Sequence, residues 1–416
     1  MKELSVVYQG FGQSIPVGTL AQDGKITLFE YSPEALTLKL DLSPLRAPLR
    51  QAAYPDKIGE YADLQGVPGF IYDSLPDGWG LRLMDRRIKA RGLDPLSLST
   101  LDRLAYLGEN TMGALVYRPS EEEHKSAKAL TLLDLANEVQ ALQEDDGHEV
   151  LAEMARAGGS PGGVRPKAQM FFNPASGTIS SQPLQAPGGE AWLVKFAASG
   201  DAADSCVLEE LYAQLASQCQ LGMSATHLFE LAGNNFAFGT QRFDRRGASR
   251  VHVHSLAGVL HANFRVPGVS YGDFLKVTRL LTRDQREVIK AFKLCVFNVL
   301  MNNQDDHAKN LAFLREEDGR WLLAPPFDLT YCPGVGGEHF MDVSGEGKAP
   351  RRSHLLATAA SAGLANNMAG RVLDEMLELM TPAVFKKMGK GLPLKSSTLT
   401  TVLRTISANH ARLSEA

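Results

Sequence analysis

Several features that would mark a specialised class of protein are missing from this chain. Its four cysteines lie far apart and no two have CxxC spacing, which disfavours a zinc site or a disulfide framework and suits a reducing compartment. Neither sign of charge dominates, since 43 Lys and Arg face 47 Asp and Glu and the formal net charge is −4. The overall charge therefore gives no reason to expect nucleic acid or an anionic membrane as a direct partner.

Long apolar runs are also missing. No stretch approaches the ~20 apolar residues that are needed to span a bilayer. The first residues include an acidic side chain and no extended apolar core, so they do not resemble a signal peptide. We therefore expect a cytoplasmic protein that does not associate with membranes.

Common functional signatures are absent as well. The chain contains no GxxxxGK[ST] phosphate-binding loop, no GxGxxG loop and no HExxH zinc motif. Aromatic residues make up only 7% and form no stacking platform for single-stranded nucleic acid. What remains is an ordinary globular composition, 44% hydrophobic and 22% charged, over a length that suggests about two or three domains.

The pattern along the chain divides it into three regions. Residues 1–120 combine β-rich runs with a hairpin around Asp23-Gly24, as in a small mixed α/β domain. The polar, charged stretch at 119–127 is the best candidate for a linker. Residues 130–245 contain a helical period, a glycine-rich stretch and strands, and residues 246–416 are mostly helical. The sequence therefore predicts an α+β fold.

The most informative segment is Asn302-Asn-Gln-Asp-Asp-His-Ala-Lys-Asn310. It is too polar for a protein core and follows a predicted helix over 284–303, and a predicted hairpin with strands at 311–314 and 321–323 separates it from Phe327-Asp328. Phosphoryl transfer needs a carboxylate that accepts the proton of the attacking hydroxyl and oxygen ligands that hold Mg²⁺ against the phosphates. The order helix, polar loop, hairpin and Phe-Asp provides these groups.

Spacing suggests a role for each polar residue. Asp305 and Asn310 are separated by four residues, the spacing of the catalytic base and the metal-binding Asn in protein kinases. Asp305 is thus the candidate base, Asn310 a metal ligand and Asp328 the principal metal ligand. We expect His307 to position Asp305, and Lys309 to touch the transferred phosphate or to stabilise the transition state. The competing interpretation is a loop whose polar side chains only cap the end of a helix.

A lysine for the nucleotide phosphates is expected upstream, paired with a helical glutamate. Lys195 lies in an apolar predicted strand at 191–196, and the following helix offers Glu209 and Glu210, of which we prefer Glu209. The alternative is a lysine at the edge of a strand whose amine simply reaches water.

Two further segments are candidates for binding the nucleotide. Gly162 and Gly163 belong to a glycine-rich stretch whose backbone N–H groups can approach phosphate oxygens, and Lys167 adds positive charge, although surface linkers share this composition. The other segment is 241–246, which follows the last predicted strand of this region and could receive the adenine of the nucleotide. The alternative is that these residues only form a charged strand end without a ligand. Its candidates are Gln241 and Phe243 for the adenine and Asp244 for the ribose.

Together these motifs resemble the HipA family of serine/threonine kinase toxins from type II toxin–antitoxin systems, over almost the whole chain. The most specific strings are Asp305-Asp-His-Ala-Lys-Asn310 and Pro326-Phe-Asp-Leu329. The other strings are Leu75-Pro-Asp-Gly78, Gly108-Glu-Asn-Thr-Met-Gly-Ala114, Ser160-Pro-Gly-Gly-Val-Arg-Pro-Lys167, Leu193-Val-Lys195 and Gln241-Arg-Phe-Asp-Arg-Arg246. The resemblance implies a two-lobed kinase-like fold with an N-terminal mixed α/β subdomain and an all-helical C-terminal half.

The resemblance also implies roles for single residues and a dependence on ATP and Mg²⁺. By position it makes Asp305 the base, Asn310 and Asp328 the metal ligands and Lys195 the ATP lysine. Members of the family autophosphorylate a serine in the glycine-rich loop, which then leaves the active site and switches the enzyme off, and Ser160 falls on that position.

Departures from the family pattern occur at three positions. Asp306 adds a charge to the catalytic loop, Pro161 restricts the backbone after Ser160, and Gln241 stands where an acidic residue can occur.

The family further implies a partner, a small HipB-like helix-turn-helix antitoxin. The chain itself shows no helix-turn-helix, so contact with DNA is expected mainly through that antitoxin. Some relatives act on aminoacyl-tRNA synthetases, which makes a synthetase one candidate for the protein substrate.

The leading hypothesis is an ATP- and Mg²⁺-dependent serine/threonine protein kinase that acts as a growth-inhibiting toxin. One alternative is a catalytically weak kinase-like protein that binds an antitoxin and tunes repression; the presence of Asp305, Asn310, Asp328 and Lys195 argues against it. Another is a kinase of a small molecule or lipid, because the ATP machinery alone does not name the acceptor.

Overall fold

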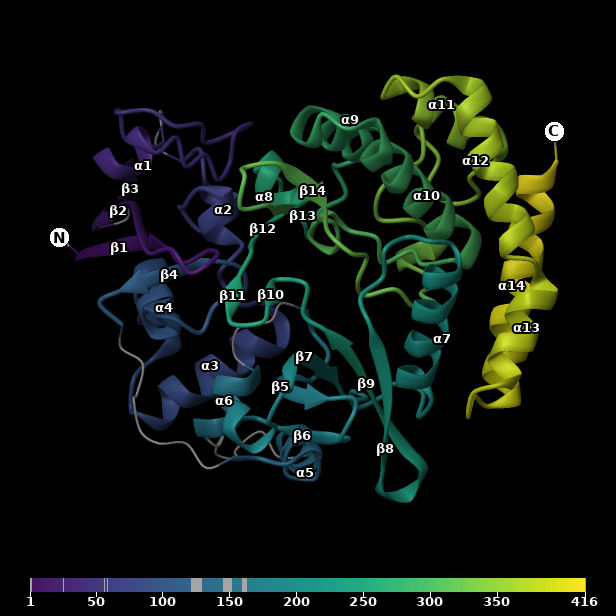
Figure 1. The fold of residues 1–416 in the computed structure, drawn as a ribbon, viewed down its shortest axis with the longest axis horizontal. Helices are drawn as coiled ribbons and strands as arrows, with labels where there is room; N and C mark the ends of the chain where they lie inside the picture. The colour runs from purple at the N-terminus through teal and green to yellow at the C-terminus, as the bar shows by residue number, and fades with distance from the viewer. Residues whose placement is uncertain are drawn as a thin grey trace.

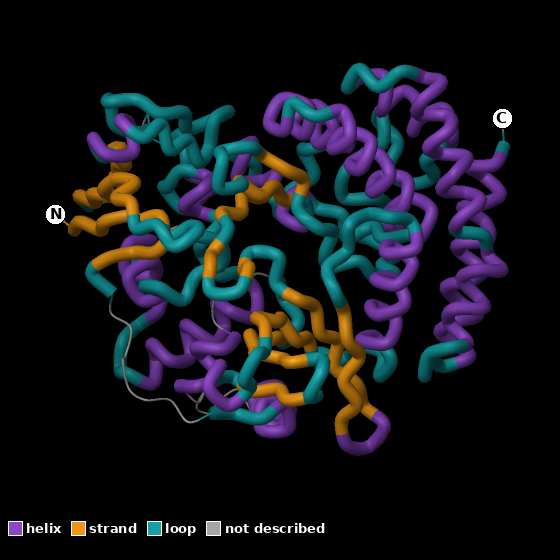
Figure 2. Tube along the Cα trace, viewed as in Figure 1, coloured by secondary structure: helices purple, strands orange, loops and turns teal. Residues whose placement is uncertain are grey.

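The computed structural model describes residues 2–24, 26–55, 57, 59–120, 129–144, 152–158 and 163–415 (Figure 1). Most of the expected linker, together with Ser160 and Gly162, lies outside these residues. Strands gather in the first two regions of the chain and helices in the last (Figure 2). The predicted α+β fold class is confirmed. None of the described helices is both long and apolar enough to cross a membrane.

A four-stranded antiparallel sheet organises the first domain, in the order β3-β2-β1-β4. β2 and β3 form the hairpin predicted around Asp23-Gly24, and alternate residues of β3 are buried because only one face of the sheet packs on the core. The strands are β1 (Lys2–Tyr8), β2 (Ile15–Asp23), β3 (Ile26–Tyr31) and β4 (Leu115–Arg118). The helices are α1 (Pro33–Thr37), α2 (Gly69–Tyr72), α3 (Gly78–Ala90) and α4 (Thr100–Leu107).

The second region contains a five-stranded antiparallel sheet in the order β6-β5-β7-β9-β8. Its strands are β5 (Lys167–Asn173), β6 (Thr178–Ser180), β7 (Glu190–Lys195), β8 (Thr226–Leu231) and β9 (Asn235–Gln241). Its helices are α5 (Leu132–Glu144), α6 (Ala152–Gly158) and α7 (Ser205–Gln218). The sequence predicted β7, β9, α5 and α7 but not β5, β6 or β8, so the sheet is wider than the predicted strand–helix–strand lobe.

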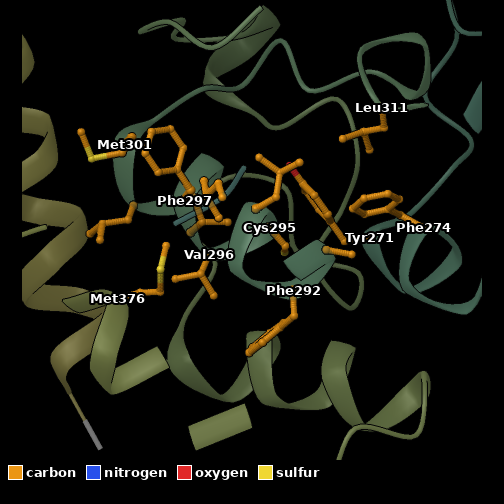
Figure 3. Close-up of a cluster of buried hydrophobic side chains, with 14 of the residues drawn as sticks. Tyr271, Phe274, Phe292, Cys295, Val296, Phe297, Met301, Leu311 and Met376 are labelled. Carbon is orange, nitrogen blue, oxygen red and sulfur yellow. The ribbon is translucent and has the colours of Figure 1, made fainter. Parts of the chain in front are cut away.

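The third region is a helical lobe built around α10 (Gln285–Met301). The side chain of Asp284 accepts a hydrogen bond from the N–H of Arg286 at the start of α10, and the left-handed backbone of Asn302, with φ 56°, ends the helix. Phe292, Cys295 and Phe297 on α10 belong to the largest buried apolar cluster of the described residues (Figure 3). The other helices are α8 (Leu256–Leu260), α9 (Tyr271–Thr282), α11 (Arg352–Ser361), α12 (Asn366–Leu379), α13 (Pro382–Lys390) and α14 (Ser396–Ser414).

This lobe is not purely helical. It contains a three-stranded antiparallel sheet of β12 (His252–Ser255), β13 (Ala312–Arg315) and β14 (Trp321–Leu323), preceded by the short pair β10 (Arg245–Arg246) and β11 (Ser249–Arg250). β13 and β14 form the hairpin that the sequence predicted between the catalytic loop and Phe327-Asp328. The mostly helical C-terminal lobe that the sequence predicted is confirmed, whereas the all-helical half that the family resemblance implied is wrong, because this sheet lies beside the predicted site.

A buried polar network fastens the first domain to β12. His254 Nδ1 lies 2.7 Å from Asp73 Oδ2, and His254 Nε2 lies 2.9 Å from Ser43 Oγ. Asp73 also accepts hydrogen bonds from the N–H and the hydroxyl of Ser255, over 2.8 and 2.6 Å. His254 and Ser43 are only 0% and 1% exposed, so no substrate reaches this group. We therefore assign it to the joint between the domains.

Candidate active site

Three charged side chains from separate elements meet at the centre of the site. Lys195 ends β7, Glu209 lies on α7, and Asp328 lies in the loop after β14. The Lys195 ammonium contacts Glu209 Oε1 and lies 2.5 Å from Asp328 Oδ1. Lys195 thus pairs with Glu209, whereas Glu210 accepts a hydrogen bond from Gln214. The structure brings together the lysine, the glutamate and the downstream carboxylate that the sequence placed at one site.

The electrostatics of this cluster are set by a competition between burial and pairing. Burial alone would lower the pKa of Lys195, but Asp328 and Glu209 outweigh it and raise that pKa above its usual value. Loss of hydration would raise the pKa of Asp328, but Lys195 and Lys167 hold it well below its usual range. Burial raises the pKa of Glu209 although Lys195 opposes the rise. Asp328 is therefore the stronger anionic partner of the ammonium, and both are charged at neutral pH.

Asp328 reaches this position through an unusual backbone conformation. Its φ is 58°, in the left-handed region that non-glycine residues seldom occupy and that Asp tolerates better than most. The ring of the preceding residue, Phe327, packs against Phe243, with 5.6 Å between the ring centroids. The Asp328 side chain is 30% exposed, so one side of the carboxylate remains open to a ligand.

Two further cations border the cluster. Lys167, the first residue of β5, pairs in register with Lys195, and burial lowers its pKa to about 8. A Cβ at Gly163 would clash with Lys167 Nζ, so the absence of a side chain there makes room for the amine. Arg165, which the sequence analysis did not single out, places Nη1 3.8 Å from Glu209 Oε2. The end of the glycine-rich stretch therefore brings positive charge to the site.

Asp305 lies on the open side of the site, in the loop that follows α10. Its side chain is 60% exposed, and His307 Nε2 lies 4.0 Å from its Oδ1. Partial burial raises the pKa of Asp305, and His307 opposes the rise. Asn310 Nδ2 donates a hydrogen bond to the carbonyl oxygen of Asp305 over 2.9 Å, which leaves the amide oxygen of Asn310 for a metal ion. The predicted base and metal-binding Asn are thus neighbours in space.

The adjacent Asp306 points the opposite way. It is 2% exposed and accepts hydrogen bonds from the Tyr271 hydroxyl over 2.6 Å and from the N–H of Phe340 over 2.8 Å. His339 Nδ1 lies 2.7 Å from the same carboxylate. The extra charge that Asp306 brings to the catalytic loop is therefore paired inside the protein, where its hydrogen bonds hold the loop in place.

The structure places Lys309 at a contact that the sequence analysis did not foresee. Its ammonium lies 2.7 Å from Asp77 Oδ2, in the first domain, and above the rings of Tyr72 and Phe264 at 5.2 and 4.9 Å from their centroids. In this structure the amine of Lys309 is paired with Asp77. A contact between Lys309 and the transferred phosphate stays a prediction. Asp77 and Arg165 each stand in a string that carries the family resemblance, but no role was assigned to either residue, because each reaches the site through long-range contacts.

The three residues proposed to bind the nucleoside have different surroundings in the structure. Phe243 lies against Phe327 beside Asp328, which suits an apolar wall for a base. The Gln241 side chain donates a hydrogen bond to Glu190 over 2.5 Å. Asp244 is 0% exposed and both of its oxygens accept hydrogen bonds from Arg242, with further ones from Arg245 and the N–H of Gly113. The ribose contact of Asp244 stays a prediction; in this structure the carboxylate is buried and paired between the first domain and the strand end.

The donor set fits one kind of metal ion. No group of three or more His, Cys, Asp or Glu side chains suited to a metal occurs among the described residues. The available donors are the Asp328 carboxylate and the Asn310 amide oxygen. Mg²⁺ is commonly bound by one or two such protein oxygens, with phosphate oxygens and water completing the shell. These residues therefore fit a magnesium ion that arrives with a nucleotide.

Comparison with known proteins identifies the family of this chain. A model of the HipA-like C-terminal domain matches residues 159–384, more than half of the chain. The chain belongs to the HipA family. A model of the HipA N-terminal domain matches residues 8–118. This HipA-family chain is accordingly a serine/threonine kinase, for which ATP is the phosphoryl donor that the family implies.

A solved structure shows the same fold. HipA of Shewanella oneidensis MR-1, in a complex with HipB and its operator DNA, is 19% identical with a TM-score of 0.71, covering 99% of this chain and 97% of that chain. The proinflammatory kinase CtkA of Helicobacter pylori is 14% identical with a TM-score of 0.37, covering 59% of this chain and 90% of that chain. No curated protein sequence matches this HipA-family chain.

Proposed function

We propose that this HipA-family kinase transfers the γ-phosphoryl group of ATP to a serine or threonine of a cellular protein, with Mg²⁺, as the toxin of a toxin–antitoxin pair. The observation that carries the proposal is the contact of Lys195 with both Glu209 and Asp328. Kinases need this lysine–glutamate pair and this metal-binding carboxylate to act together. Here they meet from three different elements of the chain.

In the proposed reaction Asp305 accepts the proton of the acceptor hydroxyl and orients its oxygen towards the phosphorus atom. The exposure of this side chain leaves room for a protein substrate. His307, 4.0 Å away, restricts where the carboxylate points. When bound, Mg²⁺ neutralises charge on the phosphate oxygens, and Asp328 and Asn310 would hold it.

The small lobe binds and orients the nucleotide in this proposal. Lys195 and Lys167 supply charge to the phosphates, and their register on β5 and β7 keeps the two amines side by side. Lys195 is held in place by Glu209, so little conformational freedom is lost when phosphate binds. Phe243 and Phe327 offer an apolar surface to the base.

Self-inactivation through Ser160 is part of the proposal. Ser160 lies outside the described residues, three positions before Gly163 in the sequence. A phosphoserine adds about −1.5 to −2 charge, which would compete with the nucleotide phosphates for Lys167 and Arg165. Mapping of phosphate by mass spectrometry after incubation with ATP and Mg²⁺ should find Ser160 modified. Modification elsewhere with Ser160 untouched would refute this part.

The partner proposed for the toxin is a HipB-like helix-turn-helix antitoxin that carries the contact with operator DNA. The support is the shared fold with a HipA chain whose structure contains HipB and operator DNA. The protein substrate is proposed only as a class, with an aminoacyl-tRNA synthetase as one candidate. Co-purification with the product of an adjacent reading frame would test the first point.

The deciding experiment compares phosphoryl transfer by wild type and Asp305→Asn. The substitution keeps the size of the side chain and removes the base, so transfer of radiolabel from ATP should fall by about 10²–10⁴-fold. A comparison of phosphoproteomes from cells that express either protein would then name the acceptor. Equal, background-level labelling by both proteins would favour the catalytically weak binding protein. Labelling of a metabolite or lipid alone would favour a small-molecule kinase.

A further inference from the structure

Asp77 of the first domain occupies a position where an aspartate normally caps its own helix. It is the residue before α3, and a side chain there usually accepts a hydrogen bond from the first turn. Asp77 makes no such bond. Its Oδ2 pairs with Lys309 Nζ at 2.7 Å, and its Oδ1 accepts the backbone N–H of Gly163. One carboxylate therefore joins the catalytic loop to the end of the glycine-rich stretch.

The two residues that follow Asp77 strengthen the same junction. Trp79 donates its backbone N–H to the carbonyl oxygen of Gly163 over 2.9 Å, and its indole N–H to the carbonyl oxygen of Lys167 over 3.1 Å. Gly78 has φ +44°, and a Cβ there would stand 2.5 Å from the carbonyl oxygen of Gly163. This close approach explains why a glycine follows Asp77. Figure 1 shows α3 beside α6, on the same side of the molecule as β5 and β7.

The ion pair itself is shielded from water. The side chains of Lys309 and Asp77 are only 13% and 10% exposed. Burial would raise the pKa of Asp77, but Lys309 and the Gly163 N–H together lower it below its usual value. The carboxylate is therefore charged at neutral pH and strongly bound to both partners. An uncapped helix start is an arrangement that costs stability, and Asp77 gives up the cap to hold these two groups.

We infer that Asp77 is a positioning residue of the phosphoryl-transfer site, through which the first domain fixes Gly163 beside Lys167 and holds Lys309 of the catalytic loop. The inference rests on the proposed kinase function for its kinetic consequence. It means that the first domain supplies part of the active site rather than only a surface for partners. Gly163, at the end of the glycine-rich stretch, and the catalytic loop then share one support.

Asp73 provides a matched control four residues earlier in the chain. It is also a carboxylate of the first domain, and it also bonds across the domain joint, to His254 and Ser255. Its partners lie on β12 and at the start of α8, and none belongs to the candidate site. Loss of either carboxylate weakens the joint, but only the loss of Asp77 releases Gly163 and Lys309.

The test uses the full-length chain with Asp77→Asn, Asp77→Ala, Lys309→Met, the double variant Asp77→Asn/Lys309→Met, and Asp73→Asn. Transfer of radiolabel from ATP is measured against ATP concentration to separate the maximal rate from the ATP dependence. Amide hydrogen exchange of a peptide that contains Gly163 is followed in the same proteins without nucleotide. Thermal unfolding reports how far each variant weakens the joint.

We expect Asp77→Asn to lower the maximal rate about tenfold, the scale of a lost charge-assisted hydrogen bond. The double variant should be no slower than the slower single variant, because the two side chains act as a unit. Asp77→Ala should speed exchange at Gly163 by about tenfold, whereas Asp73→Asn should lower thermal stability without either effect.

Equal kinetics for Asp77→Asn and Asp73→Asn, or additive losses in the double variant, would overturn the inference. Unchanged exchange at Gly163 in Asp77→Ala would overturn it as well, whatever the activity. A wild type that transfers no phosphate would instead refute the proposed function, and the exchange result would still decide whether Asp77 holds Gly163.

Discussion

The charged side chains of the two lobes that meet at the site differ in how far they are exposed to solvent. In the small lobe, Lys195 and Glu209 are 5% and 2% exposed and are paired within the protein. In the helical lobe, the Asp305 side chain is 60% exposed. The part of the site proposed to bind the nucleotide, which we call the nucleotide half, is thus already paired and closed without a ligand. The part around Asp305, which we call the acceptor half, is open to solvent. This difference suits the proposed function, in which the nucleotide is always ATP and the acceptor is a protein.

The largest expected effect comes from breaking the nucleotide half. Lys195→Met leaves the buried Glu209 without its ammonium, which should lower the free energy of unfolding by about 3 kcal/mol and abolish labelling from ATP. Denaturant unfolding and radiolabel transfer measure the two effects. The control is Lys293→Met, which removes an ion pair with the half-exposed Glu375 and should cost less than about 1 kcal/mol. Similar losses in both variants would contradict the distinction between the halves.

A smaller effect should separate two neighbours on the acceptor half. Asp306→Asn weakens the buried hydrogen bonds to Tyr271 and to the N–H of Phe340, and should lower the free energy of unfolding by about 2 kcal/mol. Asp305→Asn makes the same chemical change one residue earlier and should leave stability within about 0.5 kcal/mol, because its side chain is exposed. Chemical denaturation of both variants measures this. The idea fails if the two substitutions destabilise the protein equally.

The smallest effect concerns pH and sharpens the description of the nucleotide half. Burial lowers the pKa of Lys167 to about 8, so in the free enzyme this amine is charged below that pH and loses its charge above it. The value of kcat/KM for ATP should therefore fall as pH rises through about 8, by up to roughly tenfold per unit. Lys167→Met should be less active throughout and lack this break in the pH profile. A break of the same size in that variant would assign it to another group.

The sequence allowed prediction of the groups that depend on local order. Asp305, Asn310 and Asp328 follow one another across a single hairpin, and a strand lysine followed by a helical glutamate identified Lys195 and Glu209. The strands β5, β6 and β8 were missed because short or partly polar strands have a weak periodic signal. The sequence could not show that Asp305 faces solvent while Asp306 faces the core, since the two residues are chemically identical.

Contacts between domains were beyond sequence reasoning for a different reason. Lys309 and Asp77 are 232 residues apart, and Asp244 meets the N–H of Gly113 across 131 residues. Both pairings depend on how whole domains dock, which no local pattern encodes. The position of Lys309 and Asp244 in the chain suggested ligand contacts, which stay predictions, but gave no sign that both side chains contact the first domain.

The buried joint at Asp73, His254 and Ser43 carries a general lesson for recognising enzymes by shape. The carboxylate, the imidazole and the hydroxyl form a hydrogen-bonded chain in the same order and at the same distances as the catalytic triad of a serine hydrolase. A search that matched atoms alone would name a second enzyme inside this kinase. The Ser43 hydroxyl, however, is buried, so an ester or a peptide bond cannot approach it. Without access for a substrate, the same three groups serve only to hold the domains together.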